Sequence, residues 1–217
     1  TAAPDPTNTS PIPVTITFNE DVTDFVVGDI TVGNGTAGNF AGGPAVYTAD
    51  ITPTADGAVT VDVAADVAAD AAANGNTAAA QLSIVYDSTA PTVAITTAAP
   101  DPTNTSPIPV TITFNEDVTD FLIGDITVGN GTAGNFAGGP AVYTADITPT
   151  ADGAVTVDVA ADVAADAAAN GNTAAAQLSI VYDSTAPTVA ITTAAPDPTN
   201  TSPIPVTITF NEDVTDF

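Results

Sequence analysis

Acidic residues recur in this chain where one copy of a repeated sequence meets the next. The stretch IVYDSTAPTVAI, residues 84–95, contains Asp87, and the same stretch returns at 180–191 with Asp183. The 217-residue chain has 26 Asp and Glu and no Lys, Arg or His, so no basic side chain can balance these charges. Carboxylates that converge in such a chain must stay apart, take up protons or bind a cation.

The elements that position these acids belong to a long tandem repeat. Residues 1–121 and 97–217 align as 121 pairs that differ at only two, Val26 against Leu122 and Val27 against Ile123, which sets a period of 96 residues. That length is too great for a solenoid repeat and suits one small sandwich domain. The chain has no initiator methionine and no signal peptide, so we expect it to be an internal window of a longer array.

Period-2 alternation of apolar residues predicts seven short strands in the complete repeat. We place them at 93–97, 110–114, 125–128, weakly near 135–136, and at 141–147, 154–159 and 177–182. Gly and Pro mark the turns between them, and we interpret the alanine-rich segment 159–172 as a long loop with at most one helical turn. The pattern predicts an all-β chain of tandem immunoglobulin-like Greek-key β-sandwiches joined end to end by short linkers that contain proline.

The repeat boundaries divide the chain into three parts. Residues 1–89 form a repeat that lacks its first strand, 90–186 a complete repeat, and 187–217 the first two strands of a third.

Sandwich topology predicts which acids converge. Alternate strands run in opposite directions, so the loops after the second, fourth and sixth strands lie at the end of the sandwich where the linker enters. The oxygen-bearing side chains expected there are Asp87, Glu116, Asp117, Asp162, Asp166, Asn170 and Asn172. Their equivalents in the flanking copies are Glu20, Asp21, Asp66, Asp70, Asn74, Asn76, Asp183, Glu212 and Asp213.

Calcium is the cation that suits this set. Ca²⁺ takes 6–8 oxygen ligands in flexible geometry, whereas zinc and copper favour nitrogen and sulfur donors, and the chain has no Cys or His. Each part of the set also has a simpler interpretation. Glu116 and Asp117 can be a polar strand end, the Asp and Asn residues of 166–172 can form Asx turns, and Asp87 can cap the following turn. The general acidity can also be an adaptation to high salt.

The order of the motifs resembles a known family. The run PIPVTITFNEDVTDF, then GDITVGNGTAGNF, then DVAADAAANGNTAAA and YDSTAPTV is similar to the bacterial immunoglobulin-like domains of giant tandem surface adhesins. The resemblance covers the whole repeat. It implies secretion, a stalk or adhesive role, and often calcium at the junctions. The chain departs from the family in lacking basic residues and in having DAAANGN where the family often has DAAGN.

These observations leave two classes of function. One is an extracellular stalk or spacer that calcium stiffens at each junction, and the other is a filament or surface layer in which identical chains polymerise. In both, the expected partners are neighbouring repeats or identical chains. Without Lys or Arg, binding to nucleic acid is not expected, and no apolar run is long enough to span a bilayer. No catalytic constellation stands out, so we do not expect an enzyme.

Overall fold

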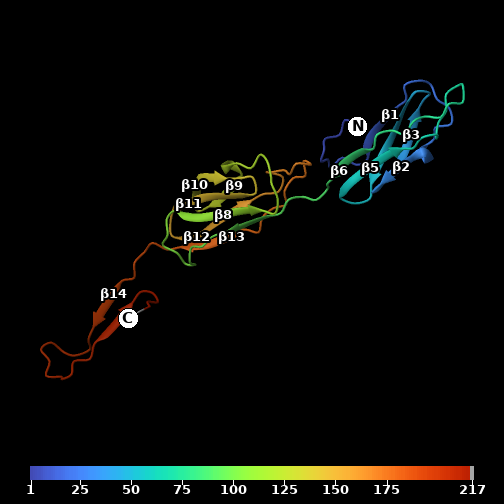
Figure 1. Cartoon of the computed structure of the whole chain (residues 1–217). Helices are drawn as coiled ribbons and strands as arrows, with labels where there is room; N and C mark the ends of the chain where they lie inside the picture. The colour runs from blue at the N-terminus through green and yellow to red at the C-terminus, as the bar shows by residue number, and fades with distance from the viewer. Residues whose placement is uncertain (216–217) are drawn as a thin grey trace.

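The computed structural model describes residues 1–215, which form two β-sandwiches followed by a pair of strands (Figure 1). The predicted third segment, 187–217, ends two residues beyond the described part of the chain. The three parts follow one another from the N-terminus to the C-terminus, and one extended segment joins each to the next.

The second repeat is a complete sandwich. Its elements are β7 (Val93–Thr96), β8 (Ile108–Phe114), the 3-10 helix η2 (Ile123–Asp125), β9 (Ile126–Gly129), β10 (Gly131–Gly138), β11 (Val142–Pro149), β12 (Gly153–Val159) and β13 (Leu178–Tyr182). They form two antiparallel sheets, of order β10-β11-β8-β7 and β13-β12-β9. This is the four-plus-three arrangement of an immunoglobulin constant-type sandwich, so the predicted fold class is confirmed.

Alternating side chains fill the space between the two sheets. Ile112 on β8, Ile147 on β11 and Val155 on β12 are each 0% exposed. At the end of the sandwich nearest the first repeat, Phe121 and Tyr143 pack edge to face with ring centroids 5.0 Å apart. The rings of Phe114 and Phe136 pack against them, so four aromatic side chains form one cluster next to the acidic loops.

The prediction for the fourth strand was wrong in length. We expected a weak strand near 135–136, and β10 instead runs over eight residues and pairs with β11 along most of its length. Its glycines give it no clear alternation, so the sequence alone does not reveal it. Pairing with a strongly patterned partner imposes the strand, as tertiary context commonly does. The long loop after β12 contains turns and isolated bridges but no helix.

The described residues of the first repeat have the same fold, and they include no counterpart of β7. Its elements are β1 (Ile12–Thr17), the 3-10 helix η1 (Val27–Asp29), β2 (Ile30–Gly33), β3 (Gly35–Gly42), β4 (Val46–Pro53), β5 (Gly57–Val63) and β6 (Leu82–Tyr86). The sheets have the orders β1-β4-β3 and β2-β5-β6. Within the described residues, nothing pairs with β1 at the position that β7 takes in the second repeat.

The third part consists of β14 (Val189–Thr192) paired with β15 (Thr207–Phe210). All four residues of β14 are exposed. Across the described residues, no helix is long and apolar enough to cross a membrane.

Candidate metal centre

Two loops are held together at the end of the second sandwich that faces the first. The backbone N–H of Thr119 donates to the carbonyl of Ala165 at 2.8 Å, and the N–H of Ala165 donates back to Thr119 at 3.3 Å. Glu116 lies three residues before this bridge, and Asp166 lies one residue after it. The bridge therefore brings two acids from loops that are distant in sequence to one place.

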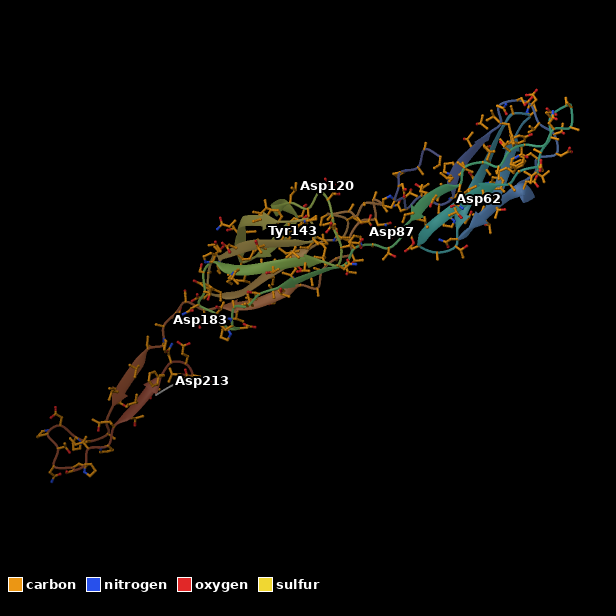
Figure 2. The ribbon with its side chains drawn as sticks, in the orientation of Figure 1. Asp62, Asp87, Asp120, Tyr143, Asp183 and Asp213 are labelled. Carbon is orange, nitrogen blue, oxygen red and sulfur yellow. The ribbon has the colours of Figure 1, made fainter. Side chains whose placement is uncertain are left out.

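The linker brings the third acid. Asp87 directly follows β6 of the first repeat and lies at the junction between the two sandwiches (Figure 2). The linker is fixed to the second repeat further on, because the N–H of Thr173 donates to the carbonyl of Pro91 at 2.8 Å. Thr92 and Asn115 also bond reciprocally, through N–H to Oδ1 at 2.6 Å and N–H to carbonyl at 3.0 Å.

Asp87, Glu116 and Asp166 form one carboxylate cluster, called here the junction trio. One oxygen from each lies within 4.8 Å of the others. Asp166 is 6% exposed, and the other two are half-buried. Repulsion between two such charges is about 3 kcal/mol per pair at an effective dielectric near 20, which makes the cluster costly without a counter-charge.

Asn170 links the junction trio to both repeats. Its Nδ2 donates to Oδ2 of Asp166 at 2.9 Å and to the backbone carbonyl of Asp87 at 3.0 Å. The second oxygen of Asp166 accepts from the N–H groups of Ala168 and Asn170, at 2.9 and 2.8 Å. Asp166 is thus held in one orientation by its own loop.

The pKa of Glu116 is raised by its surroundings in the junction trio. Burial raises the pKa of this carboxyl, and the negative charges of Asp166 and Asp87 raise it further. A hydrogen bond from Asn115 acts in the opposite direction. The cluster therefore favours a bound proton or cation at Glu116.

Three other predicted ligands of the second repeat lie outside the junction trio. Asp117 is exposed, and its charge contributes to raising the pKa of Tyr143. Asp162 is exposed and lies against Gly171, where the loop turns. Asn172 is 1% exposed and uses its amide oxygen and nitrogen on four backbone groups of its own loop, so it organises the loop instead of facing the acids.

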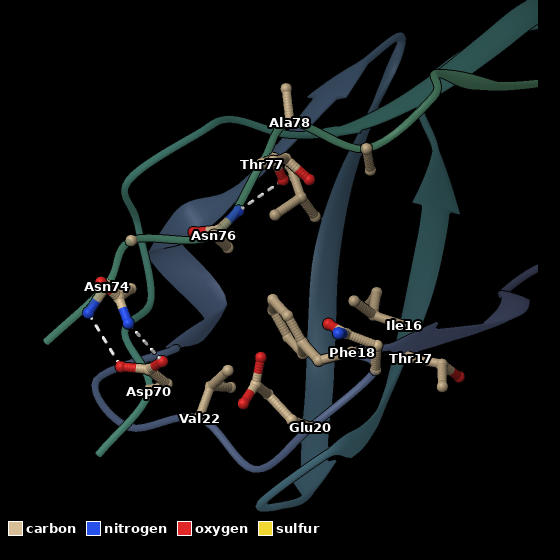
Figure 3. A pocket seen from close by; sticks show the side chains of 14 residues that line it. Ile16, Thr17, Phe18, Glu20, Val22, Asp70, Asn74, Asn76, Thr77 and Ala78 are labelled. Atoms are coloured by element: carbon tan, nitrogen blue, oxygen red, sulfur yellow. Dashed lines mark hydrogen bonds between the residues drawn. The ribbon is translucent and has the colours of Figure 1, made fainter. Parts of the chain in front are cut away.

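In the first repeat, no described residue takes the place of the linker beside the equivalent loop side chains. Glu20, Asp70 and Asn74 line a cavity of about 530 Å³ (Figure 3). Asn76 again bonds to its own loop, Asp66 lines a separate pocket with Asp24, and Asp21 is exposed.

In the third part, the predicted acids share one pocket. Asp183, Glu212 and Asp213 line it, and Asp183 and Asp213 are labelled there in Figure 2.

Comparing the first two repeats shows what the linker does. Asp166 and Ala168 are buried, whereas their equivalents Asp70 and Ala72 are half-buried and exposed. Asn8 of the first repeat also donates to the carbonyl of Ala169 at 3.1 Å. Because the two loops have the same sequence, the difference in burial comes from the docked neighbour.

Sequence reasoning missed the residue that anchors the linker on its other side. Asp56, in the turn between β4 and β5, accepts from the N–H and hydroxyl of Ser88 at 2.9 and 2.8 Å. It also accepts from the hydroxyl of Thr89 at 2.6 Å. Asp152 holds the next linker in the same way. These hydrogen bonds lower the pKa of both carboxyls, those from Thr89 and Thr185 contributing most.

Replacing Asp56 with alanine should loosen the first linker while both sandwiches stay folded. Since the hydrogen bonds lower its folded-state pKa, the stabilisation is present above the ordinary value of about 3.9 and is lost as pH falls through the folded pKa. NMR relaxation of Ser88 and Thr89 should show faster motion in the variant. The wild type should show the same faster motion at a pH below the folded pKa of Asp56. Asp152→Ala is the matched control, because it should free only Ser184 and Thr185. If the motion of Ser88 is unchanged in Asp56→Ala, Asp56 does not anchor the linker.

Fold and site together define a class: tandem immunoglobulin-like sandwiches whose junctions collect acidic side chains. The family model of the bacterial Ig-like domain matches residues 3–86 and 87–182. The chain therefore belongs to the bacterial Ig-like domain family, which confirms the resemblance found in the sequence. No curated protein matches the chain. Tandem copies of this family indicate a structural repeat module of a bacterial surface protein.

Proposed function

We propose that the chain is a calcium-stiffened stalk or spacer segment of a large extracellular adhesin or fibre. The observation that carries the proposal is the junction trio, in which one carboxylate comes from the end of the first repeat and two come from the second. A cation bound there would neutralise the repulsion only while the two repeats stay docked. Cation binding would thus favour one arrangement of the pair.

The donor set fits calcium. It offers three carboxylates, one oxygen of each lying within 4.8 Å of the others. Oxygen donors in irregular loops are the ligands Ca²⁺ prefers, and Mg²⁺ demands stricter octahedral geometry. Asp87, Glu116 and Asp166 would hold the ion, and the ion would supply the positive charge that no side chain of this chain can give.

The linker supports a stiff junction even before an ion binds. Its first residues are fixed to Asp56 of the first repeat, and Pro91 and Thr92 are fixed to the second repeat. Proline at position 91 also fixes its own φ and favours an extended Ala90. A rod built from such units gains length with each copy, and identical copies suffice for that role. We assign it no catalytic activity.

Calcium should stabilise residues 1–217 and stiffen the first junction. At a hundredfold excess over the dissociation constant, the expected gain is about 2.7 kcal/mol in the free energy of unfolding. Small-angle scattering of the monomer should show a longer mean dimension in Ca²⁺ than in chelator at equal ionic strength. Asp87→Asn should abolish most of the lengthening and leave both sandwiches folded.

Asp117→Asn is the matched control, because it removes a neighbouring charge outside the junction trio. It should respond to calcium like the wild type. If the melting temperature and the scattering profile are the same in Ca²⁺ and in chelator, the calcium role is refuted. A response that persists in Asp87→Asn would place the ion elsewhere.

A further inference from the structure

A short segment of the first repeat is fixed to the end of its last strand. The N–H of Thr7 donates to the carbonyl of Val85 at 2.9 Å, and the N–H of Asp87 donates to the carbonyl of Thr7 at 2.9 Å. The Oδ1 of Asp5 accepts from the N–H of Val85 at 2.9 Å. Thr7 is 0% exposed. The segment therefore holds both the end of β6 and the first residue of the linker, and Asn8 is the next residue along the chain.

Asn8 connects this segment to the second repeat. Its Nδ2 donates to the carbonyl of Ala169 at 3.1 Å, and the Nδ2 of Asn170 donates to the carbonyl of Asp87 at 3.0 Å. With the bond from Asp87 to Thr7, these contacts close a ring through both repeats, called here the amide ring. Its members are Thr7, Asn8, Asp87, Ala169 and Asn170. Each of its three hydrogen bonds joins an amide N–H to a backbone carbonyl, so the ring uses no carboxylate oxygen of the junction trio.

The loop of the second repeat holds the accepting carbonyl in an uncommon backbone conformation. Ala169 has φ 68, in the left-handed region, and its N–H closes a turn by donating to the carbonyl of Asp166 at 3.2 Å. In the first repeat, Ala73 has φ 64 and bonds to the carbonyl of Asp70 at 3.0 Å, where no described residue takes the place of Asn8. The loop therefore adopts this turn without a docked neighbour, which lowers the cost of docking.

We propose that residues 5–8 form a docking surface for loop 166–172 of the following repeat, and that Asn8 holds the two repeats together without an ion. The surface needs a backbone carbonyl presented by a left-handed turn and a side-chain amide at the next position. The sequence DAAANGN supplies both, in Ala169 and Asn170. The partner that fits the surface is therefore another repeat of this kind.

The same surface is built again at the end of the second repeat. The N–H of Thr103 donates to the carbonyl of Val181, and the N–H of Asp183 donates to the carbonyl of Thr103, both at 2.9 Å. Asp101 accepts from the N–H of Val181 at 2.9 Å, as Asp5 does from Val85. Asn104 then takes the place of Asn8. Each repeat thus presents an asparagine to the repeat that follows it.

The amide ring and the junction trio restrain the junction through different atoms. The ring keeps loop 166–172 against the linker, and an ion in the trio would restrict the tilt that remains. Because the hydrogen bond of Asn8 is exposed, water competes for it and its loss should change the docked population only several-fold. The docking role of Asn8 does not rest on the calcium proposal, since none of the three hydrogen bonds needs an ion.

A distance measurement between the two repeats of the full chain tests the proposal. The chain has no cysteine, so Thr31→Cys and Thr127→Cys place one spin label on each repeat, at exposed and equivalent positions of β2 and β9. Pulsed EPR in chelator then gives the distribution of label distances. Asn8→Ala should lower the ratio of docked to undocked pairs about threefold to tenfold, since one exposed hydrogen bond is lost. Asn8→Asp should lower it at least as much, because a carboxylate has no N–H to donate and adds a negative charge at the junction.

The matched control is Asn104→Ala, the same substitution one repeat further along the chain. It should leave the distance distribution of the two labels unchanged. Asn8 and Asn104 are both exposed, so neither variant should alter the melting temperature of the sandwich that carries it. A change in label distance at constant melting temperature is the result that a purely structural role within one repeat would not produce.

The outcomes separate this proposal from the calcium function. If Asn8→Ala and Asn104→Ala give the same distance distribution in chelator, whether broadened or not, the docking role of Asn8 is overturned. A wild type whose distribution narrows in Ca²⁺ would then still support the calcium function. If Asn8→Ala alone broadens the distribution while the wild type gives the same one in Ca²⁺ and in chelator, the docking surface is supported and the calcium function is not.

Discussion

Replacing Asn172 with alanine should destabilise the second repeat by about 3–5 kcal/mol, since four backbone hydrogen bonds are lost from a buried loop. The Oδ1 of Asn172 accepts from the N–H groups of Val163 and Ala164 at 2.9 and 2.8 Å. Its Nδ2 donates to the carbonyls of Ala160 and Thr173, both at 2.8 Å. The side chain is 1% exposed, so water cannot take over these four contacts without opening the loop.

The first repeat provides the control for this experiment. Asn76 makes the same set of hydrogen bonds, and it is half-buried because no residue among those described takes the position of the linker over its loop. Asn76→Ala should therefore cost less than Asn172→Ala. Calorimetry of the full chain should show two separated unfolding transitions in Asn172→Ala. Equal costs at the two positions would mean that docking of the linker adds nothing to the stability of the loop.

The junction trio could be predicted from the sequence because it depends on topology. Once the strands are assigned, loops after even-numbered strands must share the end of the sandwich where the linker enters. This placed Asp87, Glu116 and Asp166 together, along with Asp117, Asp162, Asn170 and Asn172, which the structure leaves outside the junction trio. No long-range packing detail was needed. The strand assignment in turn rested on strong alternation in β8, β11 and β12, which carry most of the core.

The roles of the other acids and amides could not be predicted in the same way. The spacing from Asp166 to Asn170 and Asn172 puts three oxygen-bearing side chains in one short loop, but it does not say which side chain turns inward. That depends on the bridge between Thr119 and Ala165 and on the burial of the loop, both set by tertiary contacts. From the sequence, Asn172 is therefore predicted to be a metal ligand. In the structure, its side chain bonds to the backbone of its own loop.

Asp56 was missed for a related reason. A T-A-D-G turn predicts an exposed aspartate, and nothing local points to Ser88 and Thr89 more than 30 residues later. The signal that could have found it is periodic. Asp56 and Ser88 recur together as Asp152 and Ser184, both beside the linker. Strand alternation places the turn after the fifth strand and the linker after the seventh at the same end of the sandwich, but only the fold shows that their side chains meet.

Replacing Glu116 with glutamine should change stability in opposite directions with and without calcium. The pKa of this carboxyl is raised by burial and by Asp166 and Asp87. Its folded pKa then exceeds its unfolded value of about 4.3, so the favourable effect is complete below that pH and is lost as pH rises through the folded pKa. At neutral pH without Ca²⁺, the ionised group is therefore unfavourable. Glutamine removes the charge, so Glu116→Gln should melt at a higher temperature than the wild type in chelator.

In Ca²⁺, Glu116→Gln should instead melt at a lower temperature than the wild type. The variant loses one of three carboxylates in the trio, and we expect affinity for Ca²⁺ to fall about tenfold to a hundredfold, or about 1.4–2.7 kcal/mol. Thermal melts in Ca²⁺ and in chelator at equal ionic strength give both signs from one pair of proteins. Asp117→Asn removes an exposed charge from the adjacent position, so its melting temperature should differ little from that of the wild type in either buffer. If Glu116→Gln lowers the melting temperature in chelator, the hydrogen bond from Asn115 at 3.3 Å outweighs the repulsion, and the carboxylates are stable together without an ion. A higher melting temperature in chelator with a lower one in Ca²⁺ requires a cation at the junction, because no other positive charge is available there.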